Sequence, residues 1–264
     1  MRRSLLLIAA AAVAVPQVAY AETPSDQAWF DLGVFRAHIN SHLRLGNEKL
    51  GIEGTDVDFE KDLGLKSHRW MPKATAGIRF LKRFRLEGDY FQLTREGHID
   101  LTHNLTIDDI VFPISADIDT HFKTDIYRVA VGYSFVRQDR AEFGISIGAH
   151  VSSAKFRIRA LNSALEEHRS KSAPLPNVGL YGSIALWGPV ALDGNVDAFK
   201  LKVGNFKGTL VDGQLGLNYR IVKNLGVGAG YRYAHYKIQA RTNSWDGTLW
   251  YNYSGPTAYL ELAI

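Results

Sequence analysis

Apolar and polar residues alternate along this chain, most regularly between residues 207 and 241. Two alternating runs there are joined by a short connection at 222–224. The odd positions of 211–221 and 225–233 hold apolar, tyrosine or glycine residues, while the even positions between them hold several glycines together with Gln214, Asn218, Arg220 and Arg232. A period of two predicts β-strands. The segment is therefore expected to form a β-hairpin whose arms are about twice as long as ordinary globular strands.

The same pattern recurs along the chain with variations. It predicts strands at about 29–45, 70–81, 85–107, 110–136, 142–152, 177–187, 190–202, 207–221, 225–241 and 255–264. Short turns near residues 83, 138, 188 and 223 alternate with longer loops, including one at 160–176. The apolar positions change parity near Tyr90 and Phe91, which predicts a β-bulge.

Short turns at one end, long loops at the other and an even number of strands are typical of outer-membrane barrels. We therefore expect an all-β fold, a transmembrane antiparallel up-and-down β-barrel. It has about ten strands, with eight as the alternative, and both termini are periplasmic. Because arms of more than 20 residues exceed the ~9–11 residues that span a membrane, the long hairpin near residue 108 should project outside.

The first 21 residues predict a secretory signal peptide. Arg2 and Arg3 precede an apolar run at 5–15, and Ala19-Tyr20-Ala21 forms a small-residue cleavage site. About 11 apolar residues are too few for a membrane helix, which needs ~20. We expect cleavage after Ala21, which leaves residues 22–264 as the barrel domain in the bacterial outer membrane.

Composition narrows the possible functions. The chain has no cysteine, so disulfide bonds cannot stabilise it after export. Its 24 glycines, 12 tyrosines and 5 tryptophans suit long strands with aromatic belts. A net charge of +4 without a clustered basic motif does not predict nucleic-acid binding. No cofactor or metal site is expected.

Alternation alone does not separate a membrane barrel from a soluble lipid-binding barrel, since each has one apolar face. Three features favour the membrane. The polar face is rich in glycine and in charges of both signs, aromatic residues lie toward strand ends, and the last strand alternates to the final Ile264.

Charged residues on the polar face are expected to point into the lumen. Buried charges are tolerated only in hydrogen-bonded pairs, and side chains largely fill barrels of this size. We therefore favour a polar plug over a selectivity ring. The expected network consists of Arg36, Arg79, Glu87, Asp89, Arg128, Glu142, Asp193, Asp197, Arg220, Arg232 and Glu261.

Catalytic patterns are weak. His150 and Ser152 have the His-x-Ser spacing of lipid A deacylases, but their parity is that of the lumen face, and a nucleophile and base also need an orienting third group. Carboxylates and a histidine at the outer rim would suit an omptin-type protease, yet no spacing links the candidates Asp56, Asp58, Asp108, Asp109 and His235. His38 and His42 share a strand face but are roughly 13 Å apart by strand rise, too far for one metal ion.

Several phrases carry a family resemblance: GTDVDFEKDLGL, RFRLEGDYFQL, YRVAVGYSFV, APLPNVGLYGSIAL, GTLVDGQLGLNYRIVKNLGVGAGYRY and YNYSGPTAYLEL. With them, nearly the whole mature chain resembles a family of uncharacterised proteobacterial outer-membrane β-barrel proteins. The resemblance implies fold and location only, because it brings no catalytic motif.

Three functions follow from these observations. The leading hypothesis is a non-enzymatic outer-membrane barrel with a charge-filled lumen and a structural or surface-interaction role. Its partners would be outer-membrane lipid and lipopolysaccharide, together with a surface ligand of unspecified chemistry. The alternatives are a narrow channel for small solutes and a lipid A-type hydrolase that uses His150 and Ser152.

Overall fold

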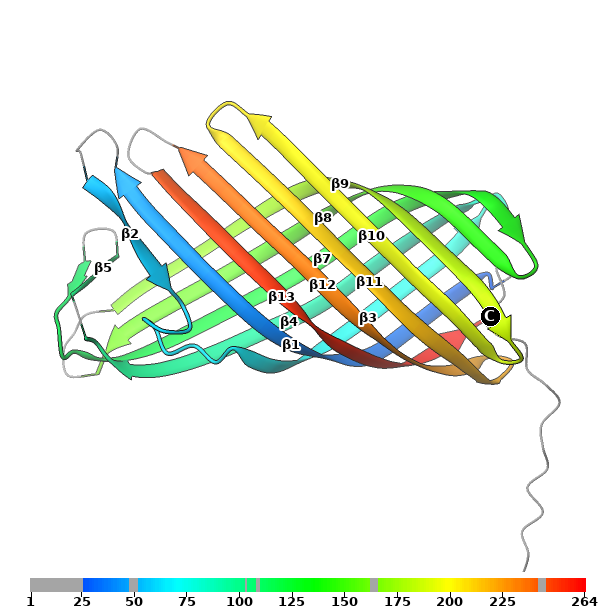
Figure 1. Cartoon of the computed structure of the whole chain (residues 1–264), viewed down its shortest axis with the longest axis horizontal. Helices are drawn as coiled ribbons and strands as arrows, with labels where there is room; N and C mark the ends of the chain where they lie inside the picture. The colour runs from blue at the N-terminus through cyan, green and yellow to red at the C-terminus, as the bar shows by residue number, and fades with distance from the viewer. Residues whose placement is uncertain (1–25, 48–51, 103, 108–109, 162–165, 242–245) are drawn as a thin grey trace, which may run out of the picture.

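The computed structural model describes residues 26–47, 52–102, 104–107, 110–161, 166–241 and 246–264. All regular elements in these ranges are β-strands (Figure 1). The expected leader at 1–21 and the turn residues Asp108 and Asp109 lie outside the described ranges. The strands are β1 Ala28–Asn47, β2 Ile52–Asp58, β3 His68–Phe80, β4 Phe84–Asp100, β5 Leu105–Ile107, β6 Ile110–Phe112, β7 Asp117–Gln138, β8 Ala141–Ala160, β9 Glu166–Trp187, β10 Val190–Val203, β11 Phe206–Val222, β12 Leu225–Arg241 and β13 Asp246–Ala263.

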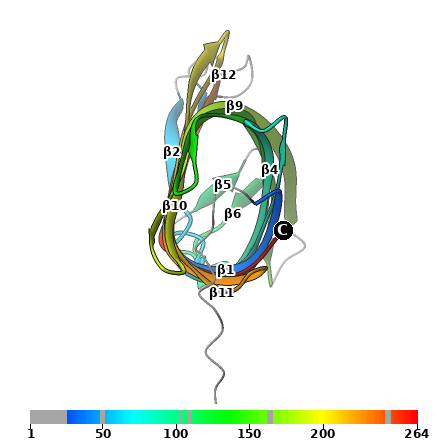
Figure 2. The same cartoon turned by 90° about the vertical axis from the view of Figure 1, so that its right-hand side faces the viewer.

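Ten of these strands form one closed antiparallel barrel. Successive barrel strands are hydrogen-bonded neighbours, and β13 pairs with β1 to close the sheet. Figure 2 views the molecule close to the barrel axis and shows the closed ring. β2 extends the wall beside the outer part of β1, and β5 and β6 form a separate small hairpin. The predicted ten-stranded up-and-down barrel is confirmed.

Both chain ends described by the structure lie at the same end of the barrel. The Gln27 backbone N–H donates to the Ile264 carbonyl at 2.5 Å, and Trp29 pairs with Ala263. The tight turns at 81–83, 139–140, 188–189 and 223–224 lie at this end, where Figure 1 marks the C-terminus. Leu81 and Lys82 have positive φ in the first of these turns, and Gly188 does in the third. The other end carries the longer connections.

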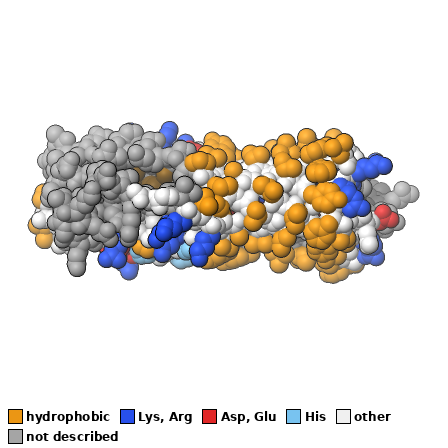
Figure 3. All heavy atoms as spheres, turned by 90° about the horizontal axis from the view of Figure 1, so that it is seen from above, with side chains coloured by type: hydrophobic (Ala, Val, Ile, Leu, Met, Phe, Trp, Pro, Cys, Tyr) orange, Lys and Arg blue, Asp and Glu red, His pale blue; other side chains and the backbone are white. Residues whose placement is uncertain are grey.

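Apolar side chains cover the face seen in Figure 3 over the half of the barrel that contains the tight turns, and exposed apolar residues of all ten barrel strands together form an apolar belt. The barrel exterior there exposes residues such as Leu32, Ile78, Val129, Ile147, Leu180, Leu215, Leu217, Leu260 and Leu262. Exposing such a large apolar surface to water would be energetically unfavourable, whereas contact with the hydrocarbon of a bilayer is favourable. No helix among the described residues is long and apolar enough to cross a membrane.

The interior changes character halfway along the barrel. Behind the apolar belt it is polar and charged, whereas beyond the belt it becomes apolar and aromatic. The outer half therefore has a hydrophobic core, formed by residues that include Phe35, Ile39, Phe59, Met71, Phe91, Leu93, Ile118, Phe122, Ile126, Leu210, Tyr236, Tyr251 and Tyr253.

This change explains why one sequence-based prediction is wrong. β4 pairs with β7 in unbroken register from Phe84 to Asp100, so it has no bulge at Tyr90 and Phe91. Leu86 is exposed on the outside, while Phe91 and Leu93 are buried inside. The apolar parity shifts because the apolar side of the wall switches from outside to inside.

Three predicted boundaries also need correction. The expected loop at 160–176 is mostly strand, because β8 and β9 stay paired from Ala141–Ile184 to Arg159–Glu166. The expected strand at 85–107 ends at Asp100, and the β5–β6 hairpin follows. The loop expected around 242–252 is shorter, since β13 begins at Asp246.

The segment at 59–67 between β2 and β3 fills the outer interior. Phe59 packs edge-on against Phe122 at 5.6 Å between ring centroids, and Leu63 and Leu65 are buried. The Leu65 N–H donates to the Phe59 carbonyl at 3.0 Å, which folds the segment on itself. The barrel end away from the tight turns is thus closed by the chain's own residues.

Candidate functional site

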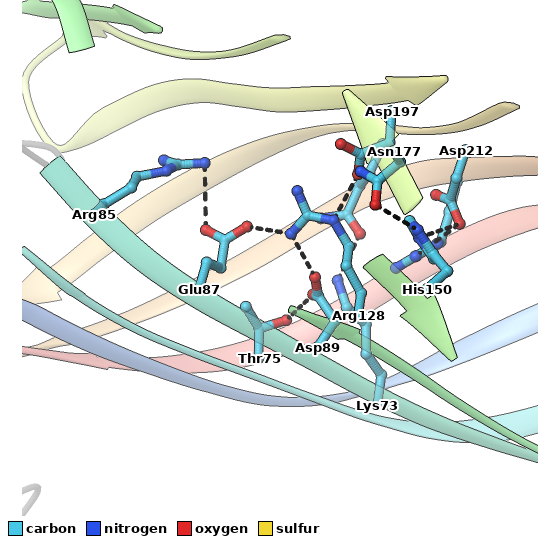
Figure 4. Close-up of polar contacts among 12 residues, drawn as sticks. Lys73, Thr75, Arg85, Glu87, Asp89, Arg128, His150, Asn177, Asp197 and Asp212 are labelled. Carbon is cyan, nitrogen blue, oxygen red and sulfur yellow. Dashed lines mark hydrogen bonds and ion pairs between the residues drawn. The ribbon is translucent and has the colours of Figure 1, made fainter. Parts of the chain in front are cut away.

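The centre of the polar lumen is organised by Arg128 of β7 (Figure 4). Its Nη1 lies 2.7 Å from Glu87 Oε1 and 2.9 Å from Asp89 Oδ2, both on β4. Its Nε lies 2.5 Å from Asp197 Oδ2 on β10. Because β7 and β10 are not neighbours in the sheet, the last contact crosses the lumen.

A second ion pair lies beside this cluster. Arg232 Nη2 of β12 is 2.9 Å from Asp212 Oδ2 of β11, and the Tyr253 hydroxyl donates to the same oxygen at 3.2 Å. The Arg232 guanidinium lies 4.6 Å from the centre of the Phe91 ring. This pair therefore marks the transition from the charged interior to the aromatic core.

Lysine and carboxylate side chains bridge other strands at the same level. Lys73 Nζ of β3 donates to Gln214 Oε1 of β11 at 2.5 Å, again across the lumen. The Thr75 hydroxyl donates to Asp89 Oδ1 at 2.8 Å, and the Tyr259 hydroxyl donates to Asp193 Oδ1 at 3.3 Å. Contacts between opposite walls at one level obstruct a continuous water path.

The end of the lumen near the termini is crossed by two further groups. Arg79 forms a bidentate ion pair with Glu142: its Nη1 contacts Oε1, and its Nη2 lies 2.6 Å from Oε2. Arg220 Nη2 lies 2.7 Å from Asp26 Oδ2 and 3.0 Å from Glu261 Oε1. A hollow of about 80 Å³ remains among these groups, enough for a few water molecules.

A charged pair, Arg95 and Glu60, lies within the apolar core of the outer half. Arg95 of β4 is fully buried, pairs with Glu60 and donates from Nη2 to the Ser41 hydroxyl at 2.6 Å. Its guanidinium also lies 5.3 Å from the centre of the Phe122 ring. Glu60 belongs to the segment 59–67, so this contact joins that segment to the barrel wall.

Ten of the eleven charged residues expected in the lumen do face it, and one does not. The prediction for Arg36 is wrong: it lies exposed on the outside, 5.9 Å from the centre of the Trp70 ring. Its neighbours Phe35 and Ala37 point inward because the interior is apolar at this level. The inward set comprises Arg79, Glu87, Asp89, Arg128, Glu142, Asp193, Asp197, Arg220, Arg232 and Glu261.

Sequence reasoning missed several members of the network, among them Asp26 and Arg85, which pair with Arg220 and Glu87. Asp212 and Lys73 share the parity of inward residues on their own strands, so alternation could have identified them. Arg95 has the same parity as Glu87 and Asp89. The bulge predicted at Tyr90 and Phe91 would have reversed that parity, so Arg95 was not expected to point inward. Glu60 had no such signal, because its position depends on how a loop folds back.

His150 and Ser152 both face the interior, as their parity indicated. His150 is fully buried, its Nδ1 lies 3.4 Å from Asn177 Oδ1, and its Nε2 lies 3.8 Å from Asp212 Oδ2. Among the described residues, the Ser152 hydroxyl has no hydrogen-bond partner. The pair is therefore not arranged as a nucleophile with its base.

The described candidates for a protease at the rim are not brought together. Asp58 accepts backbone hydrogen bonds from Glu60 and Lys61, each at 3.0 Å, and so forms a local turn. His235 on β12 contacts Asn252 at 2.5 Å. Two strands, β1 and β13, separate β12 from β2, on which Asp58 lies.

His38 contacts His68 rather than His42, with 3.1 Å between Nδ1 and Nε2. No group of three or more histidine, aspartate or glutamate residues suited to a metal ion occurs among the residues that the structure describes.

Comparison with known proteins identifies the family. The profile of the outer membrane protein beta-barrel domain matches residues 5–254. The chain belongs to this family. As an outer-membrane β-barrel protein it lies in the bacterial outer membrane, which agrees with its apolar belt.

Several solved outer-membrane proteins are similar to the chain. The outer membrane protease OmpT from Escherichia coli is 10% identical, with a TM-score of 0.64 over 94% of this chain and 100% of that chain. Neisserial surface protein A is 13% identical, with a TM-score of 0.33 over 90% and 97% of the two chains. The translocator domain of the autotransporter NalP from Neisseria meningitidis is 10% identical, with a TM-score of 0.45 over 90% of both chains. At 10% identity the likeness to OmpT concerns the fold alone. No curated protein matches the chain.

Proposed function

We propose that this outer-membrane β-barrel protein is a closed, non-conducting and non-enzymatic barrel with a structural or surface-interaction role in the envelope. The observation that carries the proposal is the filled interior. Ion pairs cross the lumen at the Arg128 and Arg79 levels, and the segment 59–67 with its aromatic neighbours fills the outer half.

The physical argument against a channel concerns the cost of opening it. A solute would have to separate Arg128 from Asp197, both of which are almost fully buried. Removing one partner of a buried ion pair costs roughly 3–5 kcal/mol. A path through the outer half would also require displacement of a packed apolar core.

Single-channel conductance in planar bilayers tests this proposal. The refolded protein is expected to insert, as judged by its heat-modifiable gel mobility, and to remain electrically silent. Steady open conductance with the same preparation would overturn the closed-barrel proposal and favour a narrow channel. A porin reconstituted in parallel shows that the bilayer reports open pores.

The lipid A hydrolase is the enzymatic alternative. We expect replacement of Ser152 by Ala to leave the lipid A of producing cells unchanged in mass, because the nearby imidazole of His150 is inaccessible. Loss of an acyl chain with the wild-type protein, but not with Ser152→Ala, would contradict the non-enzymatic proposal.

Export by a signal peptide belongs to the same proposal. Cleavage after Ala21 predicts a mature chain that begins at Glu22. The intact mass of the protein purified from outer membranes measures this directly.

A further inference from the structure

Two histidines face each other on the outer wall, where the pairing of β1 with β3 ends. His38 and His68 are the last residues paired between these strands, and both side chains are exposed. Their ring centroids lie 4.5 Å apart, and Nδ1 of His38 lies 3.1 Å from Nε2 of His68. Side chains directly opposite in an antiparallel pair are close enough to act together. We refer to these two residues as the histidine pair.

Contacts of Ser67 hold the histidine pair in place. The Ile39 N–H donates to the Ser67 carbonyl at 2.7 Å, so the chain is tied to β1 immediately before His68. The Ser67 hydroxyl lies 3.1 Å from Nδ1 of His68. A hydrogen bond at one imidazole nitrogen orients the ring and selects the tautomer. When His68 Nδ1–H donates to Ser67 Oγ, the Nε2 atom that faces His38 carries the lone pair.

The spacing of the two nitrogens is that of neighbouring ligands on a transition metal. With metal–nitrogen bonds of about 2.0–2.1 Å, nitrogens 3.1 Å apart subtend an angle of about 100° at the ion. This angle lies between the ~90° of tetragonal Cu²⁺ or Ni²⁺ and the ~109° of tetrahedral Zn²⁺. Imidazole nitrogens suit these ions, whereas Ca²⁺ and Mg²⁺ prefer oxygen ligands. The histidine pair therefore matches the first group of ions.

The pair lies on the water-exposed wall beyond the apolar belt. On β1 the last outward apolar residue of the belt is Val34, and Arg36 separates it from His38. Arg36 and Lys66 add positive charge near the pair in the chain, but both are exposed and are screened by solvent and salt. Coordination bonds from neutral imidazoles, rather than net charge, therefore decide binding. Among the described residues no third histidine or carboxylate completes the group, so water fills the remaining positions.

We infer that the histidine pair binds one divalent transition-metal ion at the outer surface of the barrel, with Cu²⁺ bound most tightly. His38 Nδ1 and His68 Nε2 are the two protein ligands. On binding, the proton of His38 Nδ1 moves through solvent to the other nitrogen of the same ring, so neutral imidazoles release no net proton. The bound ion keeps positions open for a further ligand, such as a carboxylate. This site goes beyond the proposed structural role and does not depend on whether the lumen conducts.

The test measures Cu²⁺ binding to the full protein, refolded in detergent micelles without an affinity tag, by calorimetric titration and electron paramagnetic resonance. The wild type is expected to bind one tight Cu²⁺ whose spectrum shows two imidazole nitrogens. Because the chelate needs both ligands, His38→Gln and His68→Gln should each weaken binding at least tenfold and lose one of these nitrogens from the spectrum. Binding within twofold of the wild type in either variant would overturn the inference.

A matched control, His42→Gln/His235→Gln, removes two histidines of outward parity and leaves the pair intact. Its Cu²⁺ affinity should stay within about twofold of the wild type, and a loss equal to that of His38→Gln would show unspecific binding to surface histidines. Zn²⁺ and Ni²⁺ should bind more weakly than Cu²⁺. Ca²⁺ binding as tightly as Cu²⁺ would overturn the inference, because it would indicate oxygen ligands. Heat-modifiable gel mobility verifies that every variant is folded.

Discussion

At the scale of single residues, the lumen depends on complete charge pairing, and Arg128 is the clearest case. It contacts Glu87, Asp89 and Asp197 and is almost fully buried. Replacement by Met would leave three carboxylates without their shared cation. We expect Arg128→Met to lower the free energy of unfolding by about 3–5 kcal/mol, measured by urea denaturation of the refolded protein in detergent micelles.

Arg36 provides the matched control for that variant. It is an exposed arginine on the outer wall, and its guanidinium lies 5.9 Å from the centre of the Trp70 ring. Arg36→Met should change the unfolding free energy by less than about 1 kcal/mol. Equal effects of the two substitutions would show that the buried network contributes little to stability.

His98 allows a test of electrostatics outside the membrane. Its Nδ1 lies 2.9 Å from Asp119 Oδ1 and its Nε2 lies 3.2 Å from Asp117 Oδ1. The hydrogen bond to Asp119, and then the charge of Asp117, raise the pKa of His98 above 6.5. A raised pKa means that the folded state favours the protonated imidazole. Any stabilisation is therefore complete below the unfolded pKa and is lost as the pH rises through the folded pKa.

NMR titration of the His98 ring measures this shift. The substitution Asp119→Asn should move the pKa of His98 back toward 6.5, because it removes the charged acceptor of the hydrogen bond that raises this pKa most. An unchanged titration would contradict the assigned hydrogen bond.

At the scale of strands, alternation predicted which elements form, although it did not always show which side faces lipid. It identified the inward set on β8, β11 and β12, because these strands keep apolar residues outside over the membrane half. It failed for Arg36, where the apolar parity had already inverted. In β4 the same inversion of the apolar parity was interpreted as a bulge at Tyr90 and Phe91, although the register with β7 is continuous.

Loop segments were the least predictable part. The polar composition of residues 160–176 suggested a loop, yet pairing with β8 holds most of them in β9. A strand exposed to water on one side needs only its backbone partner and does not need an apolar outer face. The position of Glu60 beside Arg95 follows from the tertiary fold of segment 59–67, which no local pattern encodes.

Gly97 on β4 tests how that segment is held. A Cβ at this position would collide with the Leu63 carbonyl and with the backbone of Gly64. We expect Gly97→Ala to displace segment 59–67, to destabilise the protein by about 1–3 kcal/mol through overpacking and to speed amide hydrogen exchange in that segment.

Gly88 on the same strand is the control, because a Cβ there would meet its nearest neighbour, the Arg128 carbonyl, at an ordinary 3.7 Å. Gly88→Ala should leave exchange in segment 59–67 unchanged. Acceleration by both substitutions would indicate a general loosening of β4 rather than a local collision.

At the scale of the whole molecule, two solvent environments explain the inversion of the wall. Within the bilayer the apolar side chains face lipid, so charged side chains remain inside and must pair with one another. Beyond the bilayer the outer face of the wall is in contact with water instead of lipid. The apolar side chains then gain more by turning inward, and the outer half acquires the hydrophobic core of a soluble β-barrel. The level at which the parity inverts should therefore mark the outer surface of the membrane.

Spin labels on β7 can locate that surface, because the chain contains no cysteine and each label site is unique. Val131, Tyr127 and Lys123 all point outward and lie on successive levels of one strand. A label at Val131→Cys is expected to be relaxed mainly by oxygen, which concentrates in lipid, and a label at Lys123→Cys by a water-soluble nickel chelate. The crossover should fall near Tyr127, one residue from the inward Ile126, where the core begins. If the oxygen-rich zone instead extended past Lys123, the apolar core would lie within the bilayer, and the inversion would need a cause other than the membrane surface.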